Sequence, residues 1–300
     1  MSKSPDVAGA APADLAVRVF FGDASPAAAN VYAQASGDLP PDARLTGSVG
    51  GPTCAYARTL AATMPLRDRG PGPTPLAEAI VPDPCFWTPE LPYLYQVDVE
   101  LRRGEQLIAR QRHLLGIRPL AVRGSDLRLA GTRWVLRGAM RDAVDERPLA
   151  AWHAAGAAML VTNPDDALCD EASRVGVLVI ARLSGDRASC EQELARVARW
   201  PAVGVAVLDE WDGQAPRPRN LLLAQRRDAT DNEPVAPWAD LALCEGGSAD
   251  DLIRFVRECR VPCLTRRRGG PYESIQEARR ACDLLQRDLA PHADPCGFFV

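Results

Sequence analysis

The hydrophobic pattern of this 300-residue chain changes near residue 123, and this change constrains the fold more than any other feature. Before it, short segments alternate between apolar and polar residues, and Pro- and Gly-rich stretches separate them. After it, short apolar segments alternate with amphipathic stretches, which is typical of repeated strand–helix units. The pattern therefore predicts a β domain at residues 1–122 and an α/β domain at residues 123–300.

Three segments of the first part have the period-two pattern of strands, and turn-forming clusters lie between them. The predicted strands are 15–21, 43–49 and 95–101. The segment 27–34 is ambiguous, because its residues would also fit a helix. Short strands with frequent turns predict a β-sandwich.

The second part contains eight strand candidates and about seven helices. The strand candidates are 134–140, 158–162, 177–181, 203–208, 234–236, 241–244, 262–265 and 296–300. The main helix candidates are 147–156, 164–176, 190–199, 219–227, 249–259 and 274–289. Eight parallel strands predict a (β/α)₈ barrel, although this part is short for a fold that usually has ~250 residues. An open doubly wound sheet is the structural alternative.

Composition excludes some classes of protein. The net charge of −4 gives no reason to expect nucleic acid as a partner. No apolar run approaches the ~18 residues of a membrane span, and the first residues lack the apolar core of a secretory signal. Nine cysteines without a C-x-x-C motif predict neither a disulfide framework nor a zinc site, and Cys259 and Cys263 are interpreted as core residues. We therefore expect a cytoplasmic protein without cofactor or metal.

The segment 84–142 contains a series of motifs in a distinctive order. A Trp-Thr-Pro-Glu turn at 87–90 leads into a strand, Gly-Ile-Arg follows at 116–118, and Leu-Arg-Gly stands at 136–138. This order resembles the junction of the immunoglobulin-like domain and catalytic barrel in glycoside hydrolase family 2, the β-galactosidase, β-glucuronidase and β-mannosidase group. Segments 150–156, 168–179 and 200–210 are also similar to that family.

The resemblance covers residues 40–300 and carries an expectation for the fold. It implies an immunoglobulin-like β-sandwich followed by a compact, truncated (β/α)₈ TIM-type barrel. We expect no counterpart of the family's N-terminal sugar-binding jelly roll within these residues.

The resemblance also assigns catalytic positions at the carboxyl ends of the barrel strands. Retaining glycosidases need two carboxyl groups about 5–5.5 Å apart. Glu210 takes the acid/base position, but Asp209 replaces the asparagine that holds the sugar 2-hydroxyl, and an ionised Asp cannot donate. Arg266 or Arg267 takes the position of the nucleophile, and a guanidinium cannot attack carbon.

Two further positions have lost the family's functional groups. In place of an Asn-x-His pair after the first barrel strand, the chain has Met140 and Asp142. In place of the Arg and His at the second strand, it has Leu160 and Asn163. Four altered positions predict that the retaining reaction has been lost.

A different site is an alternative explanation of the same residues. Glu245 could pair with Glu210 or Asp142, and inverting enzymes tolerate ~6.5–9.5 Å between their carboxyl groups. The arginines at 266–268 could bind an anion, or they could form salt bridges to Asp209 and Glu210. Trp211, near a strand end, could stack on a sugar.

Three hypotheses follow. The first is a catalytically inactive relative of the family with a binding or scaffolding role, directed at a carbohydrate or an anionic small molecule. The second is an active O-glycosyl hydrolase that uses Glu210 with a relocated carboxylate. The third is a structural subunit, whose protein partner or second copy covers the barrel edge beside the last strand. None of them involves nucleic acid or a membrane.

Overall fold

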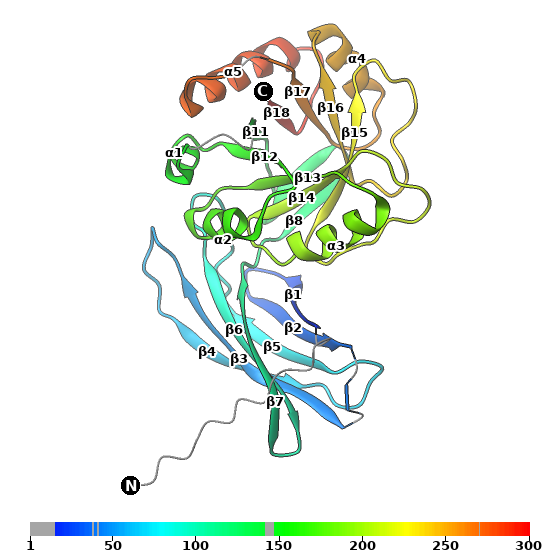
Figure 1. The fold of residues 1–300 in the computed structure, drawn as a ribbon. Coiled ribbons are helices and arrows are strands. Elements are labelled where there is room, and N and C mark those ends of the chain that lie inside the picture. The colour runs from blue at the N-terminus through cyan, green and yellow to red at the C-terminus, as the bar shows by residue number, and fades with distance from the viewer. Residues whose placement is uncertain (1–15, 38, 41, 142–146, 270) are drawn as a thin grey trace. The chain divides into compact units, whose positions relative to one another are not determined.

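The computed structural model describes residues 16–37, 39–40, 42–141, 147–269 and 271–300. The chain forms two compact units (Figure 1). One unit contains the residues up to Thr53 together with Arg58–Cys85 and Leu94–Ile117. The other contains Cys54–Ala57, Phe86–Tyr93 and Arg118–Val300.

The first unit is an antiparallel β-sandwich, as the sequence predicts. Its strands are β1 (Ala16–Ala24), β2 (Ala28–Ser36), β3 (Ala43–Thr53), β4 (Ala62–Asp68), β5 (Leu76–Pro82), β6 (Leu94–Arg103) and β7 (Gln106–Leu115). Their order is β1-β2-β5-β4-β3-β6-β7. Most of β4 pairs with β3, but Arg67 and Asp68 pair with β5, so this strand connects the two layers.

The ambiguous segment 27–34 forms a strand within β2. Its alternate residues Ala29, Val31, Ala33 and Ala35 are all buried, with exposed fractions of 1% or less. This burial on one face satisfies the period-two pattern of a strand whose opposite side faces outward. Packing inside the sandwich therefore decides against the helix.

The second unit contains a closed barrel of eight parallel strands. The strands are β11 (Leu136–Arg141), β12 (Ala158–Thr162), β13 (Val179–Leu183), β14 (Val203–Leu208), β15 (Leu222–Asp228), β16 (Leu241–Gly246), β17 (Cys263–Arg267) and β18 (Gly297–Phe299). A small antiparallel sheet of β8 (Leu120–Arg123), β9 (Asp126–Leu129) and β10 (Thr132–Arg133) precedes them. The barrel prediction is confirmed, and the open-sheet alternative is wrong.

Helices lie around the outside of the barrel strands (Figure 1). In the described residues they are α1 (Leu149–Ala154), α2 (Asp166–Val175), α3 (Arg187–Val197), α4 (Ala249–Glu258) and α5 (Ile275–Leu289). The connections from β14 to β15 and from β15 to β16 contain no helix in this part of the chain, which explains the small size of the barrel. None of these helices is long and apolar enough to cross a membrane.

The fifth barrel strand is the largest error of the sequence prediction. The segment 219–227 was predicted as a helix, but residues Leu222–Asp228 form β15, and the predicted strand 234–236 is a loop. The segment is rich in Leu, Ala, Gln and Arg, which favour helices. Pairing with β14 and β16 overrides that preference, and the described part of the chain has five helices where the sequence predicts about seven.

Side chains of the barrel strands alternate between the interior and the surrounding helices. Arg137 on β11 hydrogen-bonds Gln286 of α5, and Arg267 on β17 pairs with Asp288 of α5, so both arginines face outward. Their neighbours Gly138 and Arg266 therefore face the interior, and the strand register links both to Phe299. This alternation identifies which residues line the barrel.

The amino end of the barrel explains two motifs of the sequence. Trp87 is fully buried and donates its indole N–H to the Ser173 carbonyl oxygen at 2.9 Å. Arg118, of the Gly-Ile-Arg motif, donates to the carbonyl oxygens of Val203 at 2.8 Å and Asn220 at 2.9 Å, and also to that of Pro201. Burial lowers the pKa of Arg118 to about 10, so its guanidinium remains charged at neutral pH.

Candidate functional site

The acid/base position assigned to Glu210 lies at the carboxyl end of the barrel, where enzymes of this fold place their chemistry. Glu210 is exposed and follows β14 by two residues. Among the described residues, none forms a hydrogen bond or ion pair with its carboxylate. A free exposed carboxyl group is available for proton transfer, but it needs a second group placed opposite it.

Five inward-facing residues near Glu210 form a continuous chain of ion pairs, which we name the half-ring. In order they are Arg182, Asp209, Arg226, Glu245 and Arg266. The guanidinium–carboxylate distances along this chain are 3.1, 3.3, 3.6 and 2.8 Å. The half-ring therefore crosses the barrel mouth from β13 to β17.

The order of charges in the half-ring follows the order of the strands. Arginines come from β13, β15 and β17, whereas the carboxylates come from the end of β14 and from β16. Alternate strands of such a barrel contribute side chains to the same interior layer. Because the arginines are on every second strand and the carboxylates are on the strands between them, each carboxylate lies between two arginines. On the remaining strands β18, β11 and β12, the inward positions hold the uncharged residues Phe299, Met140 and Leu160.

Glu245 is the most buried charge of the half-ring. Its side chain is 4% exposed, its Oε1 lies 2.8 Å from Arg266, and its Oε2 lies 3.6 Å from Arg226 and 4.0 Å from Arg268. Both carboxylate oxygens are therefore engaged by guanidinium groups. A buried charge in this position depends on its partners, since an unpaired one would carry a large desolvation cost.

Asp209, at the other side of the mouth, is much more accessible. Its side chain is 47% exposed, and it lies 3.1 Å from Arg182 and 3.3 Å from Arg226. The suggested salt bridges from residues 266–268 to Asp209 and Glu210 do not form among the described residues. Arg266 pairs with Glu245 instead, because these two residues are direct neighbours in the register of β16 and β17.

Arg268 extends the charged surface beyond the half-ring. Its guanidinium hydrogen-bonds Asp228 at 2.6 Å. Hydrogen bonds from the hydroxyl and backbone N–H of Thr230, followed by the bond from Arg268, lower the pKa of Asp228 to about 2. Asp228 is therefore ionised across the physiological pH range.

Asn163 and Trp211, two of the other predicted binding residues, are engaged by their neighbours. The Asn163 side-chain amide donates to the hydroxyl and carbonyl oxygens of Ser184 at 3.0 and 3.2 Å and accepts from its backbone N–H. Trp211 carries the Arg187 guanidinium 5.1 Å above its ring centroid. One face of this ring is thus covered by a cation rather than open to a sugar.

The remaining predicted residues lie in different places. Arg267 is on the outer face of β17 and pairs with Asp288 at 2.9 Å, so it does not line the mouth. Asp142 lies outside the described residues. The half-ring brings together three of the predicted residues, namely Asp209, Glu245 and Arg266.

The prediction missed Arg182 and Arg226. Arg182 stands at the end of a predicted strand, and its position in a period-two pattern could have indicated an inward cation near the barrel mouth. Arg226 gave no such signal, because its segment was interpreted as a helix.

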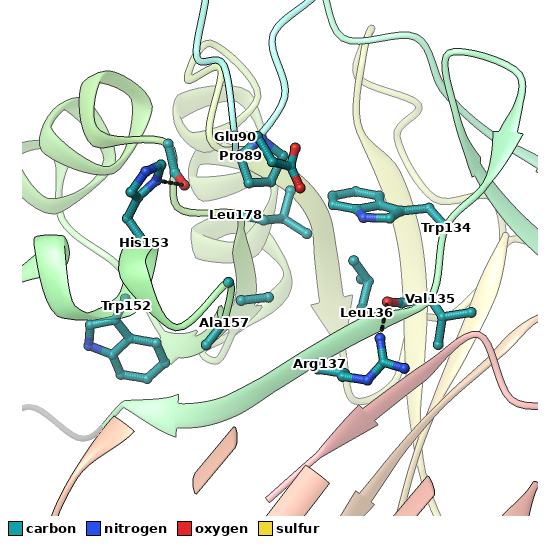
Figure 2. Close-up of a pocket in the computed structure, with 13 residues that line it drawn as sticks. Pro89, Glu90, Trp134, Val135, Leu136, Arg137, Trp152, His153, Ala157 and Leu178 are labelled. Atoms are coloured by element: carbon teal, nitrogen blue, oxygen red, sulfur yellow. Dashed lines mark hydrogen bonds between the residues drawn. The ribbon is translucent and has the colours of Figure 1, made fainter. Parts of the chain in front are cut away.

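A cavity of about 60 Å³ lies at the opposite, amino end of the barrel strands (Figure 2). Trp134, Trp152, His153 and Leu178 contribute to its lining. The His153 ring lies 3.2 Å from the Gly176 carbonyl oxygen and stacks on Tyr56 at a centroid distance of 4.4 Å. Ligand pockets usually have about 300–1,000 Å³, so this cavity is too small for a sugar.

Within the described ranges, no group of three or more His, Cys, Asp or Glu residues is arranged to hold a metal ion. The charged groups of the half-ring at the barrel mouth are carboxylates and guanidinium groups.

Comparisons with known proteins support the resemblance. Residues 5–118 match the model of the family described as Glycosyl hydrolases family 2. A search of curated proteins gives no match. The family match confirms the predicted resemblance to glycoside hydrolase family 2 for the part of the chain that it covers.

Solved structures of that group share the fold. Bacteroides uniformis β-glucuronidase 2, covalently bound to cyclophellitol-6-carboxylate aziridine, has a TM-score of 0.65 at 16% identity, covering 95% of this chain and 45% of its own. Bifidobacterium dentium β-glucuronidase complexed with coumarin-3-O-glucuronide gives 0.63 at 14%, covering 96% and 60%. A putative β-galactosidase from Bacteroides fragilis gives 0.57 at 17%, covering 83% and 46%.

These identities are low, so the structural likeness establishes the fold of the two units and not a shared activity. The chain spans 45% of the length of the Bacteroides uniformis enzyme. The immunoglobulin-like sandwich and the TIM-type barrel predicted from the sequence are both confirmed.

Proposed function

We propose that this relative of the family 2 glycosyl hydrolases does not hydrolyse glycosides by the retaining reaction and acts as a binding or scaffolding protein. The observation that carries the proposal is the half-ring in the barrel mouth. A retaining reaction needs a carboxylate that is free to attack the anomeric carbon opposite the general acid. The sequence resemblance places Arg266 or Arg267 at the family's nucleophile position, and a guanidinium is permanently charged and cannot attack.

The carboxylates that remain are poorly suited to replace the nucleophile. Both oxygens of Glu245 face arginines, and Asp209 lies between two of them. An attacking carboxylate would have to leave these guanidinium groups before it could bond to carbon. For Glu245, whose side chain is only 4% exposed, such a separation is costly.

The activity test is a panel of activated aryl glycosides that includes β-glucuronide, β-galactoside and β-mannoside. We expect no turnover above the buffer rate. Turnover that disappears in the Glu210→Gln variant would contradict the proposal and establish an active hydrolase. The matched control is Glu258→Gln, because Glu258 is an exposed glutamate at the end of α4.

An anionic sugar is the ligand class that fits the half-ring best. Its three arginines exceed its two carboxylates by one positive charge. The two β-glucuronidases compared above are bound to a carboxylate-bearing sugar analogue and to a glucuronide. We therefore propose a uronate-type sugar as the ligand, with its carboxylate near Arg226 and Arg266.

Titration calorimetry with glucuronate and with glucose tests this ligand class. We expect glucuronate to bind and glucose not to bind. In Arg226→Gln or Arg266→Gln, glucuronate should bind at least about tenfold more weakly, which corresponds to a loss of about 1.4 kcal/mol in binding free energy. Arg267→Gln is the control, because that arginine faces α5 rather than the mouth. Equal binding of both sugars, or equal loss in the control, would reject the assignment.

An active hydrolase with a relocated carboxylate is the second candidate. The observation in its favour is that Glu210 is exposed and has no partner among the described residues. Its second group would be Glu245 or Asp142. Glycoside turnover abolished by both Glu210→Gln and Glu245→Gln would favour this candidate.

A structural role is the third proposal, but the predicted open edge beside the last strand is wrong, because β18 pairs with both β11 and β17 in the closed barrel. Association with a partner or a second copy would therefore have to use another surface. Light scattering at several protein concentrations tests self-association, and a monomer at every concentration would argue against a homo-oligomer. A cytoplasmic location and the domain boundary near residue 122 remain predictions.

A further inference from the structure

Arg226 makes fewer hydrogen bonds than the other two arginines of the half-ring. Its ion pairs both use Nε, at 3.3 Å to Asp209 and 3.6 Å to Glu245, and neither has the geometry of a hydrogen bond. A guanidinium has five N–H donors. In the part of the chain that the structure describes, no donor of Arg226 is hydrogen-bonded. This cation can therefore bind a further acceptor that arrives from solvent.

The unused donors of Arg226 are open to solvent. The side chain is 28% exposed although its Nε is buried, so the exposed part includes the terminal nitrogens. Arg182, on the other side of Asp209, is 20% exposed and gives that carboxylate one hydrogen bond at 3.1 Å. An oxyanion that accepts from both guanidinium groups would gain more hydrogen bonds than Asp209 accepts there.

The two carboxylates of the half-ring are held with different strength. Asp209 is 47% exposed, and exposed ion pairs contribute little to stability because water and salt screen them. Glu245 is 4% exposed and lies 2.8 Å from Arg266, so separating this pair would leave a buried charge without its partner. An anion that enters the half-ring therefore displaces Asp209 and leaves Glu245 in place.

The barrel strands keep Asp209 close to both arginines. Asp209 directly follows Leu208 of β14, whose partners in the strand register are Leu183 and Gln225. Arg182 directly precedes the first of these partners, and Arg226 directly follows the second. A carboxylate attached in this way has a high effective concentration at the two guanidinium groups, and a dissolved anion must compete with it.

We infer that Arg182 and Arg226 form a binding site for an oxyanion, and that Asp209 occupies this site until the oxyanion displaces it. The inference rests on the proposed function, because it concerns ligand binding to the same half-ring. There the oxyanion is the carboxylate of the uronate, placed on the Arg182 side of Arg226 because Arg266 stays bound to Glu245. No covalent bond is made or broken, and the displaced Asp209 carboxylate moves into solvent.

Removing the charge of Asp209 should raise the affinity for anions. While Asp209 occupies the two arginines, the protein cannot bind the ligand there, and the apparent affinity falls in proportion to the fraction of molecules that are open. We therefore expect Asp209→Asn to bind glucuronate at least about fivefold more tightly than wild type. Asparagine is uncharged and nearly the same size as aspartate, and the exposed position makes loss of folding unlikely to interfere.

Titration calorimetry at constant ionic strength tests the exchange with two probes, glucuronate and inorganic sulfate. Sulfate contains no sugar, so it reports on the oxyanion site alone. Asp209→Asn should bind both probes at least about fivefold more tightly, and the double variant Asp209→Asn/Arg226→Gln should lose this gain.

The matched control is Asp212→Asn, which removes the same charge from the same loop. Asp212 is exposed, and its carboxylate forms no ion pair within the described ranges. Because salt screens a charge that is not in contact with the site, the control should change either affinity by less than about twofold.

The two probes separate this inference from the proposed ligand. Tighter sulfate binding in Asp209→Asn, without glucuronate binding to any variant, would support the exchange and reject the uronate. Glucuronate binding that is equal in wild type and Asp209→Asn would overturn the exchange and leave the proposed ligand standing. An equal gain in Asp212→Asn, or no sulfate binding to Asp209→Asn, would also overturn the exchange.

Discussion

The two ends of the barrel both depend on arginines, but their arginines bind different partners. At the amino end, Arg118 donates to three backbone carbonyl oxygens and no carboxylate is involved. At the carboxyl end, Arg182, Arg226 and Arg266 bind carboxylates from neighbouring strands. Carbonyl oxygens cannot titrate, so the amino end is a fixed structural contact, whereas the carboxyl end is a network that pH or an added anion can rearrange.

This contrast is compatible with the sequence prediction that the chain resembles the family but has lost its reaction. The Trp87 and Arg118 motifs, on which the sequence resemblance rests, hold the amino end of the barrel together. The sequence resemblance predicts that the carboxyl end differs from the family where that family keeps its reacting groups, and the half-ring of ion pairs lies at this end. The residues that maintain the barrel and those that would use it can therefore diverge separately.

Replacing Arg118 with methionine should have the largest effect. The change leaves three buried carbonyl oxygens without their donor, and we expect a loss of roughly 3–5 kcal/mol in the free energy of unfolding. Urea unfolding followed by tryptophan fluorescence measures it, because all six tryptophans belong to the barrel unit. The exposed Arg123→Gln is the control, and we expect it to change the free energy of unfolding by no more than about 0.5 kcal/mol. A loss below about 1 kcal/mol for Arg118→Met would show that the Arg118 contact is dispensable.

Breaking the buried end of the half-ring should have the next largest effect. Arg266→Met leaves Glu245 with only the more distant Arg226 and Arg268, and we expect a loss of about 2–4 kcal/mol. Adding Glu245→Gln should recover most of this loss, because it removes the buried charge that had lost its partner. A double-mutant cycle measures the coupling, and additive effects would mean that the pair does not interact.

Acid should weaken the carboxyl end and not the Arg118 contact. Hydrogen bonds from Thr230, together with Arg268, lower the pKa of Asp228 to about 2, below the value of about 3.9 for an unfolded chain. Stability from Asp228 is therefore fully present above about pH 4 and is lost as pH falls through 4 towards 2. Unfolding measured at pH 6 and pH 3 should show a smaller difference for Asp228→Asn than for wild type. If the stability difference between pH 6 and pH 3 is the same in Asp228→Asn as in wild type, the acid sensitivity comes from other groups.

The exposed end of the half-ring should contribute least. Asp209 is 47% exposed, and exposed ion pairs are worth about 0–1 kcal/mol. We therefore expect Asp209→Asn to change the unfolding free energy by less than about 1 kcal/mol, and added salt to reduce the difference further. A loss as large as that of Arg266→Met would show that the half-ring is equally important throughout.

Much of the fold was accessible from periodicity. The predicted strands at 158–162 and 203–208 agree with β12 and β14, and the helix at 274–289 agrees with α5 to within one residue. The strand β15 was not accessible, because Leu, Ala, Gln and Arg have no local preference for it. Its neighbours in the closed barrel supply the hydrogen bonds that make it a strand.

The candidate site was accessible only in part. Glu210, Asp209, Glu245 and Arg266 could be singled out because each stands at or just after the end of a strand. Which of them pair depends on which strands are adjacent, and this information is not local to any segment. Arg182 and Arg226 become site residues only when the barrel closes and directs them inward.

The sequence by itself determined the two-part organisation, the resemblance to family 2 and the charged residues Asp209, Glu245 and Arg266 at the ends of barrel strands. These properties depend on residue types and local spacing, which a linear chain records directly. The tertiary structure alone decided that Glu245 is bound by Arg266 and that Asp209 lies between Arg182 and Arg226. The physical reason is that ion pairs act over a few ångströms in space, and strand register and barrel closure set those distances.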